Sequence, residues 1–416
     1  MARDVSFYEP DEGRPHDLRL ASQEARLRGV LASAVHHAPA LRSTLQEAGR
    51  RAEDIGLADL PRLPLLRKEH LPAVQAGAPP FGGWLGQPGR GLRRIFVSPG
   101  PIYDPEAYDD DYWGFAPALH AAGFRSGDVV INTFSYHFTP AGAMFDGALK
   151  ALRCVAVPAG VGNLDIQVKT LLDLGARGFI GTPSFLATVL AKIAEGGARS
   201  PLDVAFVSGE PLPESLRADL ESRGARVSQG YATGDIGLIA YECPARSGLH
   251  LADRVIAELV DPGTGAPVAP GEAGEVAVTF LHELYPLLRL ATGDLSRLAE
   301  GTCPCGRTSP RLVRILGRVG DAVKVRGLFL HPRELDRAMT RHPEVLRYQA
   351  SVTRGADHQD TLTVTVELRP GAAGDLIARV TQSIRDATRL RAVVTAAEPG
   401  TIPAEAKKIE DRRTWD

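Results

Sequence analysis

The chain has 416 residues, of which 44% are hydrophobic and 24% are charged, and these are ordinary values for a globular protein. A chain of this length exceeds one ordinary hydrophobic core, so we expect two or more domains. The formal net charge of −2 gives no electrostatic basis for binding nucleic acid or an anionic membrane surface.

Cysteine usage and hydropathy indicate the compartment. Four cysteines in this length do not make a disulfide framework and fit the reducing cytoplasm. The first residues, Met1–Val5, open no apolar segment, so we expect no secretory signal. No apolar run approaches the length of about 18 residues that a membrane-spanning helix needs. We therefore expect a cytoplasmic protein.

The first 90 residues are mixed. The sequence predicts a helix over 18–31 and, after a proline turn, a second helix over 63–71. Glycines crowd residues 82–91, which indicates a loop.

From about residue 93 short apolar runs alternate with helical patterns. The predicted buried strands are 129–134, 155–158, 178–181 and 204–208. The predicted helices are 141–153, 166–175, 184–196 and 214–223. This alternation predicts an α/β fold with a mainly parallel sheet and helices on its faces. In such sheets ligands gather at the carboxyl ends of the strands.

The last 165 residues or so follow other patterns. Short strands at 254–260, 274–280 and 286–290 predict a β subdomain over about 250–316. The order helix, two strands, helix, strand then predicts a small α+β domain, with elements at 332–342, 349–368, 375–389 and 391–396. We predict an N-terminal domain over 1–318 and a C-terminal lid over 319–416.

The two domains meet at Gly317–Gly327. Its two glycines bracket the alternating residues 323–326, which predicts a short strand between two flexible points. Such a junction could let a small domain swing over a large one, or it could be a plain β-hairpin edge. The stretch resembles the hinge motif of acyl-adenylate-forming ligases, specifically phenylacetate–CoA ligase and its relatives, which places the hinge near Asp321.

Three segments before the hinge resemble nucleotide-binding motifs of this family. Ser208, Gly209, Glu210 and Pro211 follow a predicted strand and resemble the segment that packs against adenine. The loop 230–237 offers backbone donors, hydroxyls and one carboxylate, which suits a nucleotide with a metal ion or an ordinary surface turn. By resemblance, Gln229, Gly230, Tyr231, Ala232 and Thr233 bind the nucleotide, and Asp235 replaces the glutamate that helps hold magnesium.

The ribose and phosphate positions rest on the same resemblance. Leu290–Asp294 resembles the motif whose aspartate accepts hydrogen bonds from both ribose hydroxyls, a role that we expect for Asp294. Arg318 is expected near the ribose and phosphate. The alternatives are a turn aspartate and a surface arginine.

The C-terminal stretch 400–413 resembles the family loop that carries a lysine to the reacting carboxylate and α-phosphate. A lysine there neutralises charge that develops in the transition state. We expect Lys407 in this role, with Lys408 as the alternative. A solvated charged tail is the other interpretation.

A second set of residues predicts a metal site. Cys243, His250, Cys303 and Cys305 lie in Gly/Pro-rich loops and make a Cys₃His set, which is typical of structural zinc. The alternative is reduced cysteines without a metal. Some relatives of phenylacetate–CoA ligase carry zinc on this residue set, so the resemblance favours zinc.

Tyr136, His137 and Phe138 lie in an aromatic run after a predicted strand. We expect this run to line a pocket for the acyl group, with core packing as the alternative.

One segment departs from the family. Relatives grip the outer phosphates of ATP with a Ser/Thr/Gly-rich loop, whereas residues 97–105 here contain three prolines and one aspartate. Proline has no N–H to donate, and we expect Asp104 to repel phosphate. Each missing hydrogen bond to a charged oxygen costs roughly 1.5–3 kcal/mol.

The resemblance implies a carboxylate–CoA ligase that uses ATP, Mg²⁺ and CoA on an aryl or related carboxylic acid, and that forms a homodimer. The changed phosphate loop keeps an alternative open. In that alternative the same scaffold binds AMP, an acyl-adenylate or an acyl-CoA without ligating, or serves as a partner in acyl transfer.

Overall fold

A computed structural model describes residues 7–87, 91–319, 323–326, 328–330, 332–355, 359–371 and 374–413. The chain divides into two compact units. The first comprises Met1–Leu212 and Arg217–Gly317, and the second comprises Pro213–Leu216 and Arg318–Asp416. Asp321, the predicted hinge residue, lies outside the described residues.

The first unit begins with short helices. They are η1 (Pro10–Gly13), α1 (His16–Ala34), α2 (Pro39–Glu47), η2 (Ala52–Asp54), η3 (Leu57–Arg62), η4 (Lys68–His70) and α3 (Leu71–Gly77). The prediction of one helix over 63–71 is wrong, because Leu66–Arg67 form strand β1, which pairs in parallel with residues 290–291. Pro64 restricts the residue before it to extended backbone, which favours a strand entry here.

An eight-stranded sheet forms the centre of the first unit. Its order is β14-β10-β9-β8-β7-β6-β4-β5. The strands are β4 (Val129–Asn132), β5 (Val155–Pro158), β6 (Gly178–Gly181), β7 (Val204–Val207), β8 (Arg226–Thr233), β9 (Gly237–Glu242), β10 (Leu249–Leu251) and β14 (Arg311–Leu312). From β5 to β8 the pairs are parallel, as predicted.

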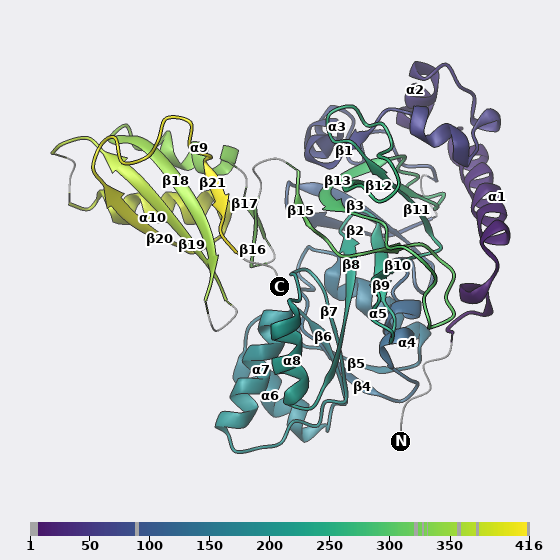
Figure 1. Ribbon diagram of the computed structural model, residues 1–416, viewed down its shortest axis with the longest axis horizontal. Helices are drawn as coiled ribbons and strands as arrows, with labels where there is room; N and C mark the ends of the chain where they lie inside the picture. The colour runs from purple at the N-terminus through teal and green to yellow at the C-terminus, as the bar shows by residue number, and fades with distance from the viewer. Residues whose placement is uncertain are drawn as a thin grey trace. The chain divides into compact units, whose positions relative to one another are not determined.

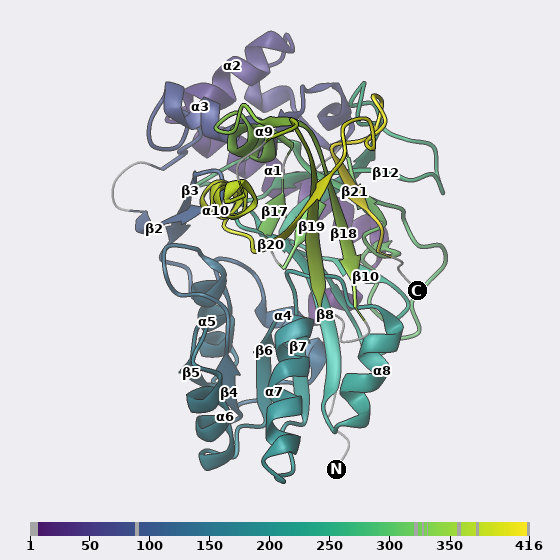
Figure 2. The ribbon, with the colours of Figure 1, turned by 90° about the vertical axis from the view of Figure 1, so that its left-hand side faces the viewer.

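Helices cover both faces of the parallel part. Helices α4 (Ala116–Ala122) and α5 (Ala141–Ala151) lie on one face, and α6 (Leu164–Asp173), α7 (Pro183–Glu195) and α8 (Glu214–Ser222) lie on the other (Figures 1 and 2). Strands β4, β6 and β7 are buried. Strand β5 lies at the edge of the sheet, and its residue Val155 is 54% exposed. The prediction that 155–158 is buried is therefore wrong.

A second sheet carries the β subdomain, with β1, β13, β12 and β11 in that order. Its strands β11 (Val255–Val260), β12 (Gly274–Phe280) and β13 (Leu290–Ser296) are antiparallel neighbours. The strand predicted at 286–290 begins only at Leu290, because Arg289 has a φ of 46° and breaks the extended run. Strands β2 (Leu92–Ser98) and β3 (Ile102–Ala107) form a separate hairpin.

The second unit is a small α+β fold. A four-stranded sheet runs β20-β19-β18-β21, built from β18 (Val345–Arg354), β19 (Asp360–Leu368), β20 (Ala392–Ala397) and β21 (Ile409–Asp411). Helices α9 (Pro332–Met339) and α10 (Leu376–Thr388) share one apolar core with this sheet. The remaining strands are β15 (Gly317–Arg318) and the hairpin of β16 (Val323–Val325) with β17 (Leu328–Leu330). The short strand predicted over 323–326 is β16, and its pairing with β17 is the hairpin of the alternative interpretation.

Candidate functional site

The carboxyl ends of β7 and β8 bring two predicted nucleotide segments together. Val207 pairs with Gln229 across these parallel strands, so Ser208–Pro211 and Gln229–Thr233 leave the sheet side by side. Ser208 Oγ donates to the carbonyl of Gly230 at 2.8 Å. Gln229 is fixed by Glu242, which accepts from its Nε2 at 2.9 Å and is paired with buried Arg217. This is the edge where ligands bind in parallel sheets.

Two positions at this edge favour glycine for different reasons, backbone conformation at Gly209 and close packing at Gly230. Gly209 has a φ of 83°, which favours glycine, and an added Cβ would lie 3.7 Å from the ring of Phe134. At Gly230 an added Cβ would lie 2.5 Å from the ring of Phe206. Residues 230–233 belong to β8 and only 234–236 form a turn, so the predicted loop over 230–237 is largely a strand. The physical reason is the antiparallel pairing of β8 with β9.

Asp294, the aspartate predicted to bind ribose, contacts the segment Gln229–Thr233. Tyr231 Oη donates to Asp294 Oδ2 at 2.8 Å, so a residue of β8 and a residue of β13 meet here. The backbone N–H of Asp294 donates to Thr292 Oγ1 at 3.1 Å. Arg289, just upstream, is 1% exposed and pairs with Glu258 at 2.9 Å, so its role is to hold the chain entry to β13.

Asp235, the predicted magnesium ligand, lies in the turn after β8 and is 1% exposed. Its Oδ2 forms an ion pair with Lys68 Nζ, a residue that the sequence did not point to. Its Oδ1 and the hydroxyl of Thr233 are buried without a hydrogen-bond partner among the described residues. Oxygen atoms of this kind are the donors that Mg²⁺ prefers, so the residues present fit the ion.

The segment in place of the phosphate loop is the β2–β3 hairpin. Ser98 pairs with Ile102, and the exposed turn between them is Pro99-Gly100-Pro101. The side chain of Asp104 is fully buried, and its Oδ2 would lie 3.4 Å from a Cβ added at Gly234 in the turn after β8. Burial, with Asp235 nearby, raises the pKa of Asp104 well above its usual value. A raised pKa favours the uncharged acid, which weakens the repulsion of phosphate that we expect from the sequence.

The raised pKa of Asp104 predicts a pH effect on stability. The folded protein holds this proton to higher pH than the unfolded chain, whose aspartates titrate near about 3.9. The unfolding free energy should therefore fall as pH rises from about 4 towards the folded pKa. Asp104→Asn cannot lose the proton, so denaturant titrations should show this variant gaining stability relative to the parent protein as pH rises.

Asp110→Asn is the matched control for this experiment, because Asp110 is exposed and its pKa is lowered by Lys150. Its stability difference should not grow with pH in the same direction. A constant difference between Asp104→Asn and the parent from about pH 5 to pH 8 would contradict a raised pKa of Asp104.

In the segment predicted to line the acyl site, hydrogen bonds hold Tyr136, whereas His137 and Phe138 are exposed. Tyr136 Oη donates to Asp146 Oδ1 at 2.6 Å and accepts from Asn132 Nδ2 at 2.8 Å. Its ring lies over Gly142, where an added Cβ would be 2.9 Å away. His137 is exposed and Phe138 is 65% exposed. Tyr136 thus has the rigidity of a pocket wall, whereas the other two lie at the surface of the first unit.

Arg318 and Lys407 belong to the second unit. Lys407 is exposed, and no hydrogen bond or ion pair of its side chain is found in the described part of the chain. Lys408 differs, because its Nζ contacts Asp336 Oδ1 at 2.6 Å and lies 5.8 Å from the ring centre of Tyr348. Local contacts therefore hold the side chain of Lys408, whereas the exposed side chain of Lys407 has none of this kind among the described residues.

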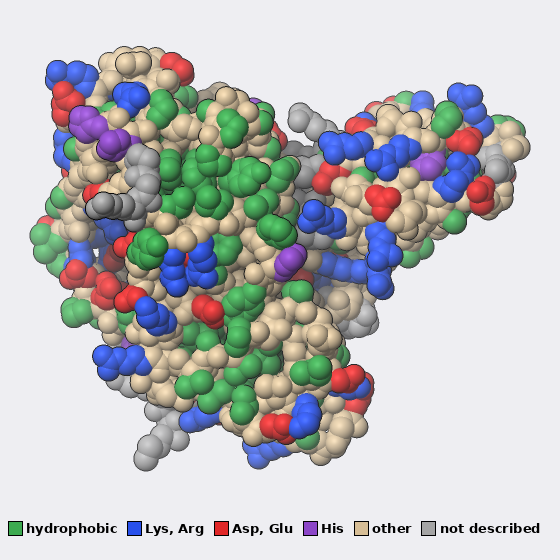
Figure 3. All heavy atoms as spheres, turned by 180° about the vertical axis from the view of Figure 1, so that it is seen from behind, with side chains coloured by type: hydrophobic (Ala, Val, Ile, Leu, Met, Phe, Trp, Pro, Cys, Tyr) green, Lys and Arg blue, Asp and Glu red, His purple; other side chains and the backbone are tan. Residues whose placement is uncertain are grey.

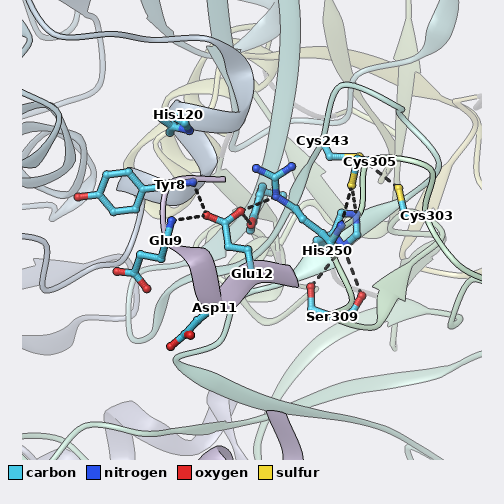
Figure 4. A network of polar contacts seen from close by, with 12 residues as sticks. Tyr8, Glu9, Asp11, Glu12, His120, Cys243, His250, Cys303, Cys305 and Ser309 are labelled. Atoms are coloured by element: carbon cyan, nitrogen blue, oxygen red, sulfur yellow. Dashed lines mark hydrogen bonds and ion pairs between the residues drawn. The ribbon is translucent and has the colours of Figure 1, made fainter. Parts of the chain in front are cut away.

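The four predicted metal ligands converge (Figure 4). Cys243 follows β9, His250 lies in β10, and Cys303 with Cys305 lies in the loop before β14, and their ligand atoms are all within 4.8 Å of one another. Tetrahedral zinc places sulfur ligands roughly 3.8 Å apart. Cys243 and Cys303 sulfurs are 3.5 Å apart, so the residues present fit zinc.

Neighbouring groups orient these ligands. Nδ1 of His250 lies 3.2 Å from Ser309 Oγ, which leaves Nε2 to face Cys305 Sγ at 3.4 Å. Burial lowers the pKa of His250 to about 4, so its ring is neutral at neutral pH. A cavity of about 420 Å³ lined by Cys303 lies beside the cluster. It gives an entry path for an ion.

The N-terminal segment packs onto this cluster (Figure 4). Glu12 Oε2 accepts from Arg307 Nε at 2.5 Å, and its Oε1 accepts from the backbone of Tyr8 at 2.7 Å. Arg307 in turn donates its backbone N–H to Cys305 Sγ at 3.4 Å. The ion pair therefore joins the start of the first unit to the cysteine loop.

Comparison with known proteins assigns this arrangement. The family described as AMP-binding enzyme matches residues 103–279, and the AMP-binding enzyme C-terminal domain matches residues 327–413. A phenylacetate-coenzyme A ligase of Thermus thermophilus is 32% identical over 87% of this chain and 84% of its own length. The chain belongs to the AMP-binding enzyme family. Within this family it is a phenylacetate–CoA ligase-like, acyl-adenylate-forming enzyme.

Other relatives agree with this family assignment. A phenylacetate-coenzyme A ligase of Aromatoleum evansii is 29% identical over 97% of both chains. Among solved structures, a 2-hydroxyisobutyryl-CoA ligase in complex with 2-HIB-AMP and CoA superposes with a TM-score of 0.89 and 24% identity. It covers 100% of this chain and 94% of its own. This likeness shows that the AMP-binding enzyme shares its fold.

Sequence reasoning missed three residues of the site. Lys68 pairs with Asp235, Arg67 lies beside Glu275, and Glu275 contacts the ribose segment. Glu275 follows Gly274 in a predicted strand, which carries no sign of its contact. Arg67 and Lys68 fell inside a segment predicted as helix, so their position beside β13 was not foreseen.

Proposed function

We propose that this AMP-binding enzyme is an ATP-dependent carboxylate–CoA ligase that acts on an aryl or related carboxylic acid. The carboxylate attacks the α-phosphorus of ATP and pyrophosphate leaves. The CoA sulfur then attacks the acyl carbonyl, and AMP leaves. The observation that carries the proposal is the meeting of Tyr231 with Asp294 at 2.8 Å beside the strand ends of β7 and β8. The aryl substrate is supported by the activity that the two phenylacetate-coenzyme A ligases are named for.

Each residue has a defined part in this proposal. Asp294 accepts from the ribose hydroxyls, and Ser208–Pro211 with Gln229–Thr233 form the adenine side. Tyr136 forms a wall of the acyl site, with His137 and Phe138 near its mouth. Asp235 would hold magnesium, which offsets phosphate charge, while the ion pair with Lys68 keeps that carboxylate in place. Arg318 would lie near the ribose and phosphate, and Lys407 would reach the reacting groups when the lid, residues 319–416, turns near Asp321.

The experiment is acyl-CoA formation across a panel of aryl and small aliphatic acids with ATP, Mg²⁺ and CoA. We expect AMP and a CoA thioester with at least one aryl acid. The β2–β3 hairpin, which replaces the phosphate loop, favours the alternative of a protein that binds AMP or acyl-CoA without ligating. No thioester with any acid, together with AMP binding in calorimetry, would support that alternative.

We also propose that the Cys₃His cluster holds a structural zinc ion. Cys303→Ser should reduce zinc well below one per chain and lower the free energy of unfolding by about 3 kcal/mol or more, since metal binding contributes to folding. Zinc analysis and denaturant titration measure both. Cys154→Ser, outside the cluster, is the matched control. Full zinc in Cys303→Ser would contradict the site.

A homodimer and a cytoplasmic location complete the proposal. Hydrophobic side chains gather on one face of the first unit (Figure 3), and the edge strand β5 is exposed. Exposed apolar patches of this kind mark contact surfaces between proteins. No disulfide joins Cys154, Cys243, Cys303 or Cys305, as is expected in a reducing compartment. No helix in the described residues is long and apolar enough to cross a membrane.

A further inference from the structure

The ribose aspartate lies in an irregularity of strand β13. Glu275 pairs with Leu295 and Ala277 pairs with Ala291. Strand β13 therefore advances four residues over the stretch in which β12 advances two. The additional residues form a bulge at Thr292–Asp294. A bulge aims a side chain away from the regular alternation of a strand, and such features need specific contacts to hold them.

Glu275 supplies one of those contacts from the neighbouring strand. Its carboxylate is 2% exposed, and Oε1 accepts from the backbone N–H of Gly293 at 2.9 Å. Gly293 has a φ of 78°, so the chain turns sharply just before Asp294. Thr292 Oγ1 holds the other side of the turn by donating to the carbonyl of Val276 at 2.9 Å.

The buried carboxylate is balanced by strand β1. Arg67 Nη1 lies 3.5 Å from Glu275 Oε2, and Arg67 Nη2 donates to the carbonyl of Pro262 at 2.5 Å. The next residue, Lys68, pairs with Asp235. Two consecutive residues of the β1–η4 junction thus support the ribose bulge and the turn that carries the proposed magnesium ligand. A buried carboxylate is costly without such a partner.

We propose that Glu275 is a positioning residue that sets the selectivity for ribonucleotides by fixing Gly293 and hence the direction of Asp294. Glu275 does not touch the nucleotide in this account. The proposal rests on the proposed function, because it takes Asp294 as the acceptor of both ribose hydroxyls. Arg67 assists by keeping the Glu275 carboxylate in place.

The test is calorimetry of the full-length protein with AMP, 2′-deoxy-AMP and 3′-deoxy-AMP. The parent should bind AMP at least about tenfold more tightly than either deoxynucleotide, since each loses a hydrogen bond to a carboxylate. Glu275→Ala should reduce this ratio to within about threefold. Glu275→Gln keeps an oxygen for the Gly293 N–H and should restore most of the ratio.

The control is Glu258→Ala, in the adjacent strand β11, which removes a buried partner of Arg289. This variant should lower stability and leave the ratio of AMP affinity to deoxynucleotide affinity unchanged. It therefore separates a general loss of stability from a change in the direction of Asp294. If Glu275→Ala keeps the affinity ratio of the parent protein, the proposed role of Glu275 is overturned, while the assignment of the nucleotide site is unaffected. A parent that does not bind AMP, or binds all three equally, overturns the ribose assignment and the proposal together.

Discussion

Replacement of Lys407 by alanine is expected to slow adenylate formation by about 10²- to 10³-fold, the usual loss when one preorganised charge is removed from a transition state. Both lysines of the loop before β21 are exposed, but only Lys408 is held by an ion pair, with Asp336 at 2.6 Å. Single-turnover measurement of pyrophosphate release with saturating acid tests this expectation.

Lys408→Ala is the matched control, one residue away in the same loop. It removes an exposed ion pair with Asp336, which is worth about 1 kcal/mol or less, so adenylation should change by a few-fold at most. If Lys408→Ala abolishes adenylation and Lys407→Ala does not, the two lysines have been assigned the wrong way round.

Asp294→Ala should weaken AMP and ATP binding by about 10²-fold or more. Two hydrogen bonds from ribose hydroxyls to a carboxylate are lost, at roughly 1.5–3 kcal/mol each. The change also removes the acceptor of the Tyr231 hydroxyl at 2.8 Å. Calorimetry measures the affinity, and steady-state kinetics should show the same loss in kcat/KM for ATP.

Asp261→Asn controls for the loss of a carboxylate in the same β subdomain. Asp261 is exposed and accepts from the backbone of Thr264 in the turn after β11. This variant should bind AMP like the parent. Unchanged AMP affinity in Asp294→Ala would place the sugar elsewhere.

The alternating part of the fold could be predicted because its signal is local. Runs such as 178–181 and 204–208 are apolar, short and bounded by helical patterns, and they became the buried strands β6 and β7. Run 155–158 is also short and apolar but lies at the sheet edge. Sequence patterns predict strand formation, whereas the order of strands in a sheet depends on long-range pairing.

In the site, too, features set by local sequence could be predicted and features set by long-range contacts could not. The convergence of Cys243, His250, Cys303 and Cys305 was predicted by residue type, and the structure brings these residues together. The ion pair of Lys68 with Asp235 joins residues 167 positions apart, so no local spacing could reveal it. The bulge at Asp294 likewise depends on Glu275 of another strand.

In the hairpin at residues 92–107, chemical composition did not predict the environment of Asp104. The prolines of the hairpin predict a loss of phosphate donors, but the burial of Asp104 could not be predicted from its charge. A strand pair that presents alternate side chains to opposite faces places Asp104 inward, where burial and Asp235 raise its pKa.

Exchange of labelled pyrophosphate into ATP, measured without CoA and with each acid of the panel, isolates the first half-reaction. The account predicts exchange that requires an added aryl carboxylate and Mg²⁺, and that falls with Lys407→Ala and Asp294→Ala. Absence of exchange with every acid, in protein that binds AMP and holds its zinc, would contradict it.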